Sequence, residues 1–227
     1  MRWNMPLSLE HAGLLLDRLD LRPGQRITDL GCGWGELLLA AVARAGADTT
    51  GVGVDQDLPL LARGRAAAAR RGLDVSFTAA DAAGWRGTAD RLLCTGASHA
   101  FGGTSGALSA LAKMVRPGGR LLLGDAFWSR PPSEAAIGMF GDDLLELPDL
   151  LEAGRAEGWR VIHLSEADQR EWDDFESTFR AGQQEWLLAN GDDPRAPKIR
   201  EWLDSRERQY VSVYRGLLGF AYLVLAR

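Results

Sequence analysis

Three acidic residues that follow short apolar runs have the spacing most suggestive of chemistry. Asp29 lies in "QRITDL", Asp55 ends "TTGVGVD" and Asp81 follows "LDVSFTAA", with 26 residues from each acid to the next. That interval fits one strand and one helix, so the carboxylates are predicted to gather at the carboxyl edge of a parallel sheet, where open α/β sheets bind ligands. Carboxylates there form charge-assisted hydrogen bonds with ribose hydroxyls or pair with cations.

A glycine loop follows the first of these acids. "DLGCGWGE" places Gly31, Gly33 and Gly35 in a G-x-G-x-G pattern, which is one residue shorter than the G-x-G-x-x-G loop of dinucleotide-binding proteins. Glu36 begins the next helical pattern, where it complements the helix dipole but would repel a diphosphate. The loop therefore favours a ligand that carries a cation.

The elements that position these residues alternate strands with helices. Five apolar runs are typical of strands: "QRITDL", "TTGVGV", "LDVSFTA", "DRLLCTG" and "GRLLLGD". Helical patterns begin near Gly35, Leu58 and Thr104, and a helix capped by Ser8 and running to about Asp20 precedes the first strand. Runs that are apolar on both faces predict a mostly parallel, doubly wound, Rossmann-like α/β sheet.

The second half of the chain has a different residue composition and pattern. "RPGGR" at 116–120 predicts a turn into the fifth strand, and 126–158 contains a Pro-Pro break and two helical stretches. "WRVIHLS" and "GFAYLVLAR" predict a sixth and a seventh strand. About 50 charged, helical residues, 166–215, separate these two strands, more than an ordinary connection needs. We expect them to form a helical lid over one edge of the sheet.

Composition narrows the class of protein. The formal net charge of −5 argues against a surface that follows nucleic-acid phosphates, and no apolar run is long enough to span a membrane. Cys32 and Cys94 are far apart and belong to no Cys/His cluster, which predicts neither a disulfide nor a metal site. We therefore expect a cytoplasmic protein without nucleic-acid or membrane partners. The sequence carries no sign of its oligomeric state.

The motifs "DLGCGWGE", "GVDQ", "AADA" and "RPGGRLLLGD", in this order, resemble those of class I S-adenosylmethionine-dependent methyltransferases. The resemblance covers residues 8–125, which it makes the cofactor-binding core of a single domain, 1–227. It implies a seven-stranded sheet with an antiparallel last strand, and substrate-lid elements at 126–158 and 166–215. The wider pattern is similar to bacterial small-molecule methyltransferases of poorly defined substrate.

The resemblance also implies a role for individual residues around S-adenosylmethionine, whose product is S-adenosylhomocysteine. The methionine end is assigned to Asp29, Gly31, Cys32, Gly33 and Gly35. The ribose is assigned to Asp55 with Gln56, and the adenine to Asp81 with Ala82. Thr95, Gly96 and Ala97 are expected beside the sulfur that bears the methyl group.

The methyl acceptor is expected over the end of the fourth strand, in "TGASHAFGG". His99 is the candidate general base or orienting group, because its unperturbed pKa lies near neutrality. The alternative is a histidine that only hydrogen-bonds the turn. Aromatic residues expected to contact the acceptor are Phe101, Phe127, Trp128, Tyr210 and Tyr214, although such residues also commonly fill cores.

Other residues of the same types are assigned structural roles. His11 and His163 are expected to be structural. Asp125 has no matching second and third acid for a divalent ion, so no metal is expected.

The function predicted is transfer of a methyl group from S-adenosylmethionine to an oxygen, nitrogen or carbon atom of a small molecule. One alternative is an RNA or protein methyltransferase, disfavoured by the acidic balance and by "GASH" in place of an "NPPY"-type tetrad. A second is a non-catalytic S-adenosylmethionine-binding protein. A hydride-transferring dehydrogenase is the third.

Overall fold

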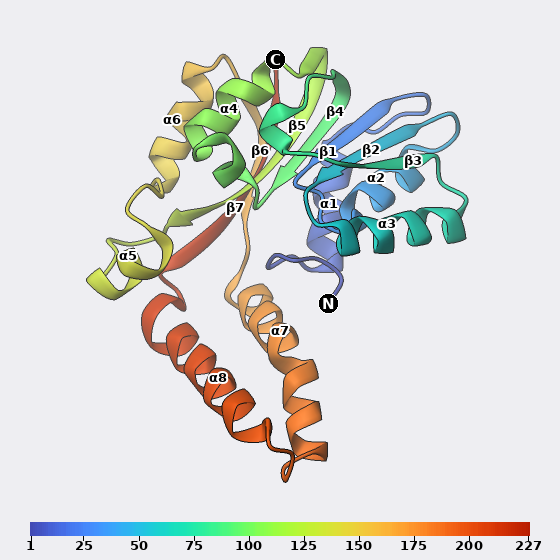
Figure 1. Ribbon diagram of the computed structural model, residues 1–227. Helices are drawn as coiled ribbons and strands as arrows, with labels where there is room; N and C mark the ends of the chain where they lie inside the picture. Colours follow the sequence, from blue (N-terminus) through green and yellow to red (C-terminus); the bar gives the residue numbers. More distant parts are fainter.

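Strands form where the sequence has short runs that are apolar on both faces. The computed structural model describes residues 1–227 and contains one sheet of seven strands (Figure 1). They are β1 (Arg26–Leu30), β2 (Thr50–Asp55), β3 (Val75–Ala79), β4 (Ala89–Thr95), β5 (Val115–Trp128), β6 (Arg160–Glu166) and β7 (Leu218–Ala226). Their order is β3-β2-β1-β4-β5-β7-β6, and β7 is antiparallel to both of its neighbours. The predicted fold class is confirmed.

The helices begin close to the predicted positions. They are α1 (Leu9–Arg18), α2 (Glu36–Ala45), α3 (Leu58–Arg71), α4 (Thr104–Ala112), α5 (Glu134–Phe140), α6 (Leu147–Ala156), α7 (Gln169–Ala189) and α8 (Ala196–Gln209). Short turns of 3₁₀ helix, η1 (Ala82–Gly84) and η2 (Ser98–Phe101), follow β3 and β4, and a π-helical turn, η3 (Tyr210–Tyr214), follows α8. Ser8 caps α1, because its side chain accepts a hydrogen bond from the backbone N–H of His11.

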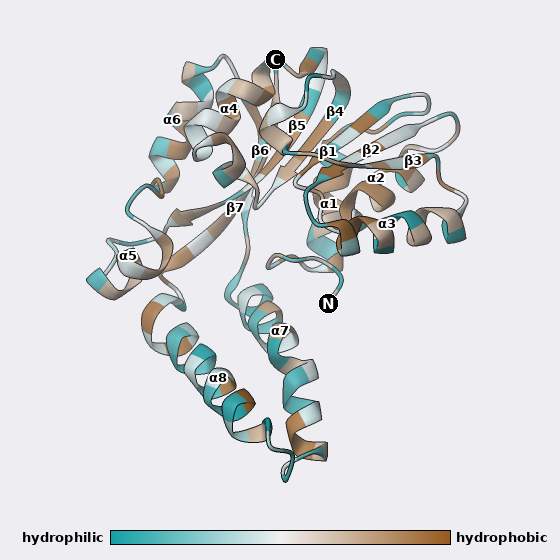
Figure 2. Cartoon of the chain, viewed as in Figure 1, coloured by the Kyte–Doolittle hydropathy of each residue, from teal (hydrophilic) through white to brown (hydrophobic).

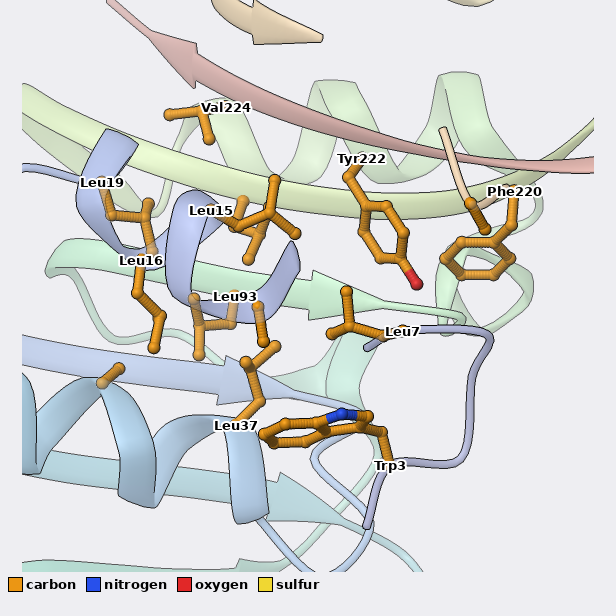
Figure 3. Packing of buried hydrophobic residues seen from close by; sticks show 14 of the residues in the cluster. Trp3, Leu7, Leu15, Leu16, Leu19, Leu37, Leu93, Phe220, Tyr222 and Val224 are labelled. Atoms are coloured by element: carbon orange, nitrogen blue, oxygen red, sulfur yellow. The ribbon is translucent and has the colours of Figure 1, made fainter. Parts of the chain in front are cut away.

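The core consists of two layers, one on each face of the sheet. Successive strand residues point to opposite faces, so Leu93 and Leu122 pack against α1 and α2, whereas Leu92 and Leu121 pack against α4 and α6. The first layer is seen in Figure 3, where the leucines of α1 lie over Leu93 and the side chains of β7. In Figure 2 the central strands are the apolar part of the chain, while α7 and α8 are largely hydrophilic.

β5 is longer at both ends than the sequence predicts. Residues 116–120 belong to the strand as an irregularity opposite β4, where Ala89 pairs with Val115 but Arg91 pairs with Arg120. At the other end β5 continues past Asp125 because β7 pairs with it as far as Trp128. The prediction of a strand end at Asp125 is wrong. The turn predicted at 116–120 lies within the bounds of β5 as this irregularity, with Gly118 at φ +75°.

The segment 166–215 forms an antiparallel hairpin of α7 and α8 that projects away from the sheet (Figure 1). Its base is held by polar contacts. The carboxylate of Glu176, 1% exposed, accepts hydrogen bonds from both Arg206 (3.1 and 2.8 Å) and the Tyr214 hydroxyl (2.8 Å). The Tyr210 hydroxyl donates to Asp173 at 2.6 Å. The helical segment is thus fixed at its root and extends outward.

His11 joins α1 to the root of this hairpin. Its Nδ1 lies 3.1 Å from the Glu171 carboxylate, and its Nε2 lies 2.7 Å from the Ser165 hydroxyl on β6. Hydrogen bonds to His11 and to the Ser8 side chain and N–H lower the pKa of Glu171 to about 2, against the opposing effect of burial. His163 lies on β6 with its Nε2 buried and unpaired. His11 therefore has the structural role expected of it, as a link between α1, β6 and α7.

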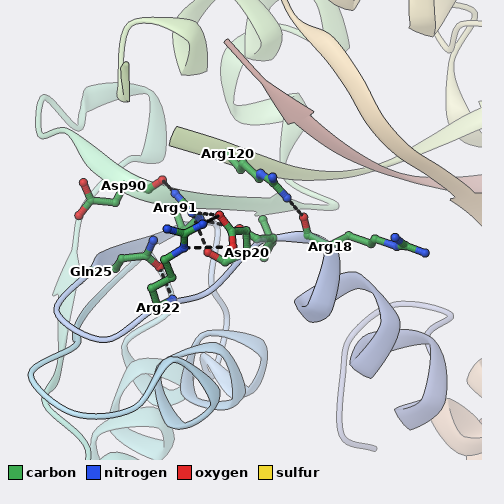
Figure 4. Close-up of polar contacts among 8 residues, drawn as sticks. Arg18, Asp20, Arg22, Gln25, Asp90, Arg91 and Arg120 are labelled. Carbon is green, nitrogen blue, oxygen red and sulfur yellow. Dashed lines mark hydrogen bonds and ion pairs between the residues drawn. The ribbon is translucent and has the colours of Figure 1, made fainter. Parts of the chain in front are cut away.

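A buried arginine ties the end of α1 to β4 at the amino edge of the sheet (Figure 4). Arg91, 5% exposed, donates to the carbonyl oxygens of Leu19 (2.5 Å) and Asp20 (2.7 Å). Arg120 on β5 donates to the carbonyl of Arg18. These contacts satisfy the carbonyl of Arg18 at the end of α1 and those of the two residues that follow the helix.

The buried carboxylate at the root of the hairpin gives a test of this arrangement. Glu176→Ala leaves Arg206 and the Tyr214 hydroxyl without their shared acceptor, so we expect it to lower the free energy of unfolding by about 2–4 kcal/mol. Glu207→Ala is the control, because Glu207 pairs with Arg180 from a side chain that is 54% exposed, and the expected loss is below about 1 kcal/mol. Urea unfolding measures both, and equal losses would contradict the assignment.

Candidate functional site

A cavity of about 440 Å³ opens at the carboxyl edge of the sheet, a size typical of small-ligand sites. It brings together most of the residues predicted to bind a cofactor. Those that line it are Asp29, Gly31, Cys32, Gly33, Asp55, Gln56, Ala82, Thr95, Gly96 and Ala97. His99 lines the same cavity. Residues from the ends of β1, β2 and β4 therefore converge on one cavity. Of the three acids whose spacing predicts a shared edge, Asp29 and Asp55 line it and Asp81 does not.

The glycine loop is folded back across the ends of β1 and β2. The N–H groups of Gly31 and Cys32 both donate to the carbonyl oxygen of Val54, at 2.9 and 3.0 Å. Gly31 has φ +75°, and a Cβ at this position would lie 2.3 Å from the Cβ of Ala97. Only a glycine lets the loop approach the end of β4 this closely.

Asp29 is a buried carboxylate that faces this cavity. It is 3% exposed, and its Oδ1 has no hydrogen-bond partner in the chain. Burial, together with the nearby charge of Asp55, raises its pKa to about 8. An unpaired buried carboxylate that lines a cavity fits a ligand with a cationic group, which would supply the missing partner.

Asp55 ends β2 and contacts the same loop. Its Oδ2 accepts a hydrogen bond from the N–H of Gly33 at 2.7 Å, and its Oδ1 accepts one from the N–H of Asp57 at 3.0 Å. Each carboxylate oxygen can accept further hydrogen bonds. Asp55 can therefore hold a ligand hydroxyl while it fixes the glycine loop.

Two of the predicted cofactor residues do not line the cavity. Gly35 has φ +67°, and a Cβ there would lie 2.4 Å from the ring of Phe77, so this glycine shapes the turn into α2. Asp81 is exposed and caps η1, since its side chain accepts a hydrogen bond from the N–H of Ala83 at 3.1 Å. Its neighbours Ala80 and Ala82 are the ones that line the cavity.

His99 stands on η2, directly after β4. The structure gives its imidazole no hydrogen bond within the chain, which leaves both ring nitrogens available to a ligand. The turn itself is anchored by Asp125, 5% exposed, which accepts hydrogen bonds from Ser98 (2.9 Å) and Thr104 (2.5 Å). Burial raises the pKa of Asp125, while these hydroxyls and the Ala126 N–H oppose the rise.

Asp125 is thus committed to the turn that carries His99. Across the chain, no three His, Cys, Asp or Glu side chains come together in an arrangement suited to a metal ion.

The aromatic residues expected at the acceptor do not line this cavity. Phe127 and Trp128 are 2% and 5% exposed and belong to the two core layers, because β5 continues through them. Tyr210 and Tyr214 are each 4% exposed, and their hydroxyls are committed to carboxylates of α7. Phe101 packs beside the layer under α4. The expectation that these side chains wall the site is corrected accordingly.

The hairpin of α7 and α8 contributes no residue to the cavity, so the expected lid over its mouth is also absent. The segment before α1 takes that place instead, and it is the part of the site that the sequence analysis missed. Arg2, Trp3, Asn4 and Met5 line the cavity. The segment has no periodic pattern and no motif, and the unusual "RWNM" composition is its only sequence signal.

Comparisons with known proteins agree with this site. Residues 27–119 match the methyltransferase domain family. The uncharacterized protein YjhP of Escherichia coli (strain K12) is 33% identical over 233 residues, which cover 99% of this chain and 93% of YjhP. The nocamycin O-methyltransferase of Saccharothrix syringae is 34% identical over 111 residues, 47% of this chain and 40% of that protein.

A solved structure extends the likeness to the cofactor. The S-adenosylmethionine-dependent methyltransferase of Geobacter sulfurreducens, in complex with S-adenosyl-L-homocysteine, superposes with a TM-score of 0.87 and 32% identity. The match covers 99% of this chain and 93% of that one. The chain belongs to the class I S-adenosylmethionine-dependent methyltransferases, and it is an enzyme whose cofactor is S-adenosylmethionine. None of its helices is long and apolar enough to cross a membrane.

The raised pKa of Asp29 predicts a pH dependence of cofactor binding. Only the ionised carboxylate pairs with a cation, so affinity for S-adenosylhomocysteine should rise with pH by up to about tenfold per unit below pH 8, and then level off. Calorimetric titrations from pH 6 to 8.5 measure this slope. Asp29→Asn should remove it, whereas His99→Ala, which changes another titratable lining residue, should keep it. An unchanged slope in Asp29→Asn would contradict the assignment.

In the ligand-free protein, the raised pKa of Asp29 affects stability, and here the effect of rising pH is unfavourable. Because the folded state keeps the Asp29 proton that the unfolded chain has lost, stability should fall as the pH rises from about 4 to about 8. Thermal unfolding over this range, compared with Asp29→Asn, isolates the contribution of this carboxyl.

The glycine loop gives a further test with a matched pair. Gly31→Ala and Gly33→Ala both place a side chain at positive φ, +75° and +54°, which costs about 1 kcal/mol or more. Only at Gly31 does the new Cβ overlap Ala97, since at Gly33 the nearest atom is 4.0 Å away. Both variants carry the backbone strain, and only Gly31→Ala adds the overlap. We therefore expect Gly31→Ala to weaken S-adenosylhomocysteine binding by about tenfold more than Gly33→Ala does. Indistinguishable affinities would contradict the close approach.

Proposed function

We propose that the enzyme transfers the methyl group of S-adenosylmethionine to an oxygen, nitrogen or carbon atom of a small molecule in the cytoplasm. The observation that carries the proposal is that His99, whose imidazole has no hydrogen bond within the chain, lines the same cavity as Asp29 and Asp55. The imidazole proposed as proton acceptor and the two carboxylates assigned to the cofactor thus line one cavity.

Each residue has a part in this proposal. Asp29 pairs with the ammonium group of the methionine end, and Asp55 with Gln56 holds the ribose hydroxyls. Thr95, Gly96 and Ala97 form the wall of the cavity beside the sulfur, and Ala80 and Ala82 lie beside the adenine. When bound, the cofactor supplies a methyl group that its sulfonium already activates for in-line displacement, so the protein contributes mainly position and orientation.

His99 acts on the acceptor. Its imidazole accepts the proton of an acceptor hydroxyl at a ring nitrogen as that oxygen attacks the methyl carbon. With an acceptor ammonium group, the imidazole takes the proton before the attack, which frees the lone pair of the nitrogen. Asp125 fixes the turn that presents the ring, through the Ser98 and Thr104 hydroxyls on either side of it. Asp125 is therefore a positioning residue for His99.

Charge and size support a small acceptor over a macromolecule. The cavity is lined by the carboxylates of Asp29, Glu36 and Asp55, and the chain as a whole carries a formal charge of −5. The net negative charge of the chain disfavours RNA, whose binding depends on neutralising phosphates. The nocamycin enzyme, by its name an O-methyltransferase, adds support for a small-molecule acceptor.

The acceptor class is tested by following a labelled methyl group. The enzyme is incubated with methyl-labelled S-adenosylmethionine and, separately, with small metabolites, total RNA and total protein from bacterial cells. We expect label in the metabolite fraction alone. Label in RNA, with a steep decrease at higher salt, would favour an RNA methyltransferase. Tight cofactor binding with no transfer to any fraction would favour a non-catalytic binding protein.

The role of His99 is tested on the labelled metabolite. His99→Ala should lower turnover by about 10²–10⁴-fold, the range typical of general-base catalysis, while affinity for S-adenosylhomocysteine stays nearly unchanged. Turnover is measured under saturating conditions, and affinity by calorimetry. Unchanged turnover would remove the catalytic role and leave His99 as a residue of the turn.

A further inference from the structure

The segment before α1 crosses the mouth of the cofactor cavity and is held there by two tryptophans. Trp3 is 7% exposed and lies against Leu37 of α2 (Figure 3). Trp34, in the glycine loop, donates a hydrogen bond from its indole N–H to the carbonyl oxygen of Arg2 at 2.8 Å. The backbone at Arg2 is therefore fixed directly to the loop that binds the cofactor.

The cavity has an unequal distribution of charge. Three carboxylates line it, those of Asp29, Glu36 and Asp55, and Arg2 is the one permanently charged cation among its lining residues. Glu36 is already paired, because Arg71 donates to both of its carboxylate oxygens at 2.8 Å. Asp29 and Asp55 are thus the acids available to a ligand.

Arg2 itself is uncommitted. Its guanidinium makes no ion pair or hydrogen bond within the chain, and it lies over the ring of Trp3, with 5.7 Å between Cζ and the ring centroid. A guanidinium that lines a ligand cavity and has no acidic partner is available to bind a carboxylate, which it can do with two parallel hydrogen bonds.

We propose that Arg2 binds the carboxylate of the methionine end of S-adenosylmethionine. This end of the cofactor carries an ammonium and a carboxylate group, and the proposed function assigns the ammonium to Asp29. The inference rests on that assignment. With the ammonium group bound by Asp29, Arg2 is the permanently charged cation of the same cavity that is left for the carboxylate. The segment before α1 is then part of the cofactor site, and the Trp34 hydrogen bond holds Arg2 in place.

The test compares two ligands that differ only in the carboxylate. S-adenosylhomocysteine carries it, and the decarboxylated analogue of S-adenosylhomocysteine keeps the amine and lacks the carboxylate. Arg2→Gln should weaken binding of the first by about five- to tenfold and change binding of the second by less than about twofold. Arg2→Lys, which keeps the charge, should retain most of the affinity. Calorimetry measures the affinity of the wild type and of both variants for each ligand.

Two controls separate a direct contact from general effects. Arg170→Gln removes the same charge from an exposed arginine of α7 that lines a neighbouring cavity and not this one, so both affinities should stay at the wild-type level. Asp29→Asn should weaken binding of both ligands, since both keep the amine.

Either of two results would overturn the proposal for Arg2. In one, Arg2→Gln weakens both ligands equally, which would indicate disruption of the segment. In the other, it weakens neither. If Asp29→Asn still weakens both ligands in that case, the assignment of Asp29 stands and only the role of Arg2 is lost. Wild-type protein that binds neither ligand would overturn both.

Discussion

The close approach of the glycine loop to the end of β4 is the constraint on which the site depends. Two consecutive N–H groups, those of Gly31 and Cys32, share the carbonyl oxygen of Val54, and this folds the loop across β1 and β2. The loop then passes Ala97 with no room for a Cβ. As a result, side chains from three separate strands face one cavity, although they are far apart in the sequence.

The fold was predictable because burial on both faces leaves a strong pattern. "GRLLLGD" could be recognised as an inner strand since its leucines serve both core layers, with Leu122 on one side and Leu121 on the other. The ends of β5 were not predictable in the same way. Its extension to Trp128 depends on pairing with β7, a contact between residues distant in sequence that no local pattern reports.

The residues of the candidate site could be predicted where their position depends on the end of a strand. They could not be predicted where it depends on how side chains pack against one another. The spacing of three acids at strand ends singled out Asp29 and Asp55, which line the cavity, together with Asp81, which does not. The aromatic residues were misplaced because a tyrosine in a helical stripe looks the same whether it faces a ligand or, like Tyr214, donates to a buried carboxylate. Asp81 illustrates a related ambiguity, since an aspartate after a strand can equally cap the next turn. The segment around Arg2 lies outside every regular element, so periodicity could not reveal it.

The segment before α1 also has a second neighbour. Arg2, Trp3 and Met5 line the cofactor cavity on one side and, on the other, a cavity of about 380 Å³ that reaches Phe175 and Thr178 of α7. The segment before α1 is therefore a wall shared by the two cavities. The position of this segment therefore contributes to the shape of both cavities. Helix α7 of the projecting hairpin, which contributes no residue to the first cavity, lines the second.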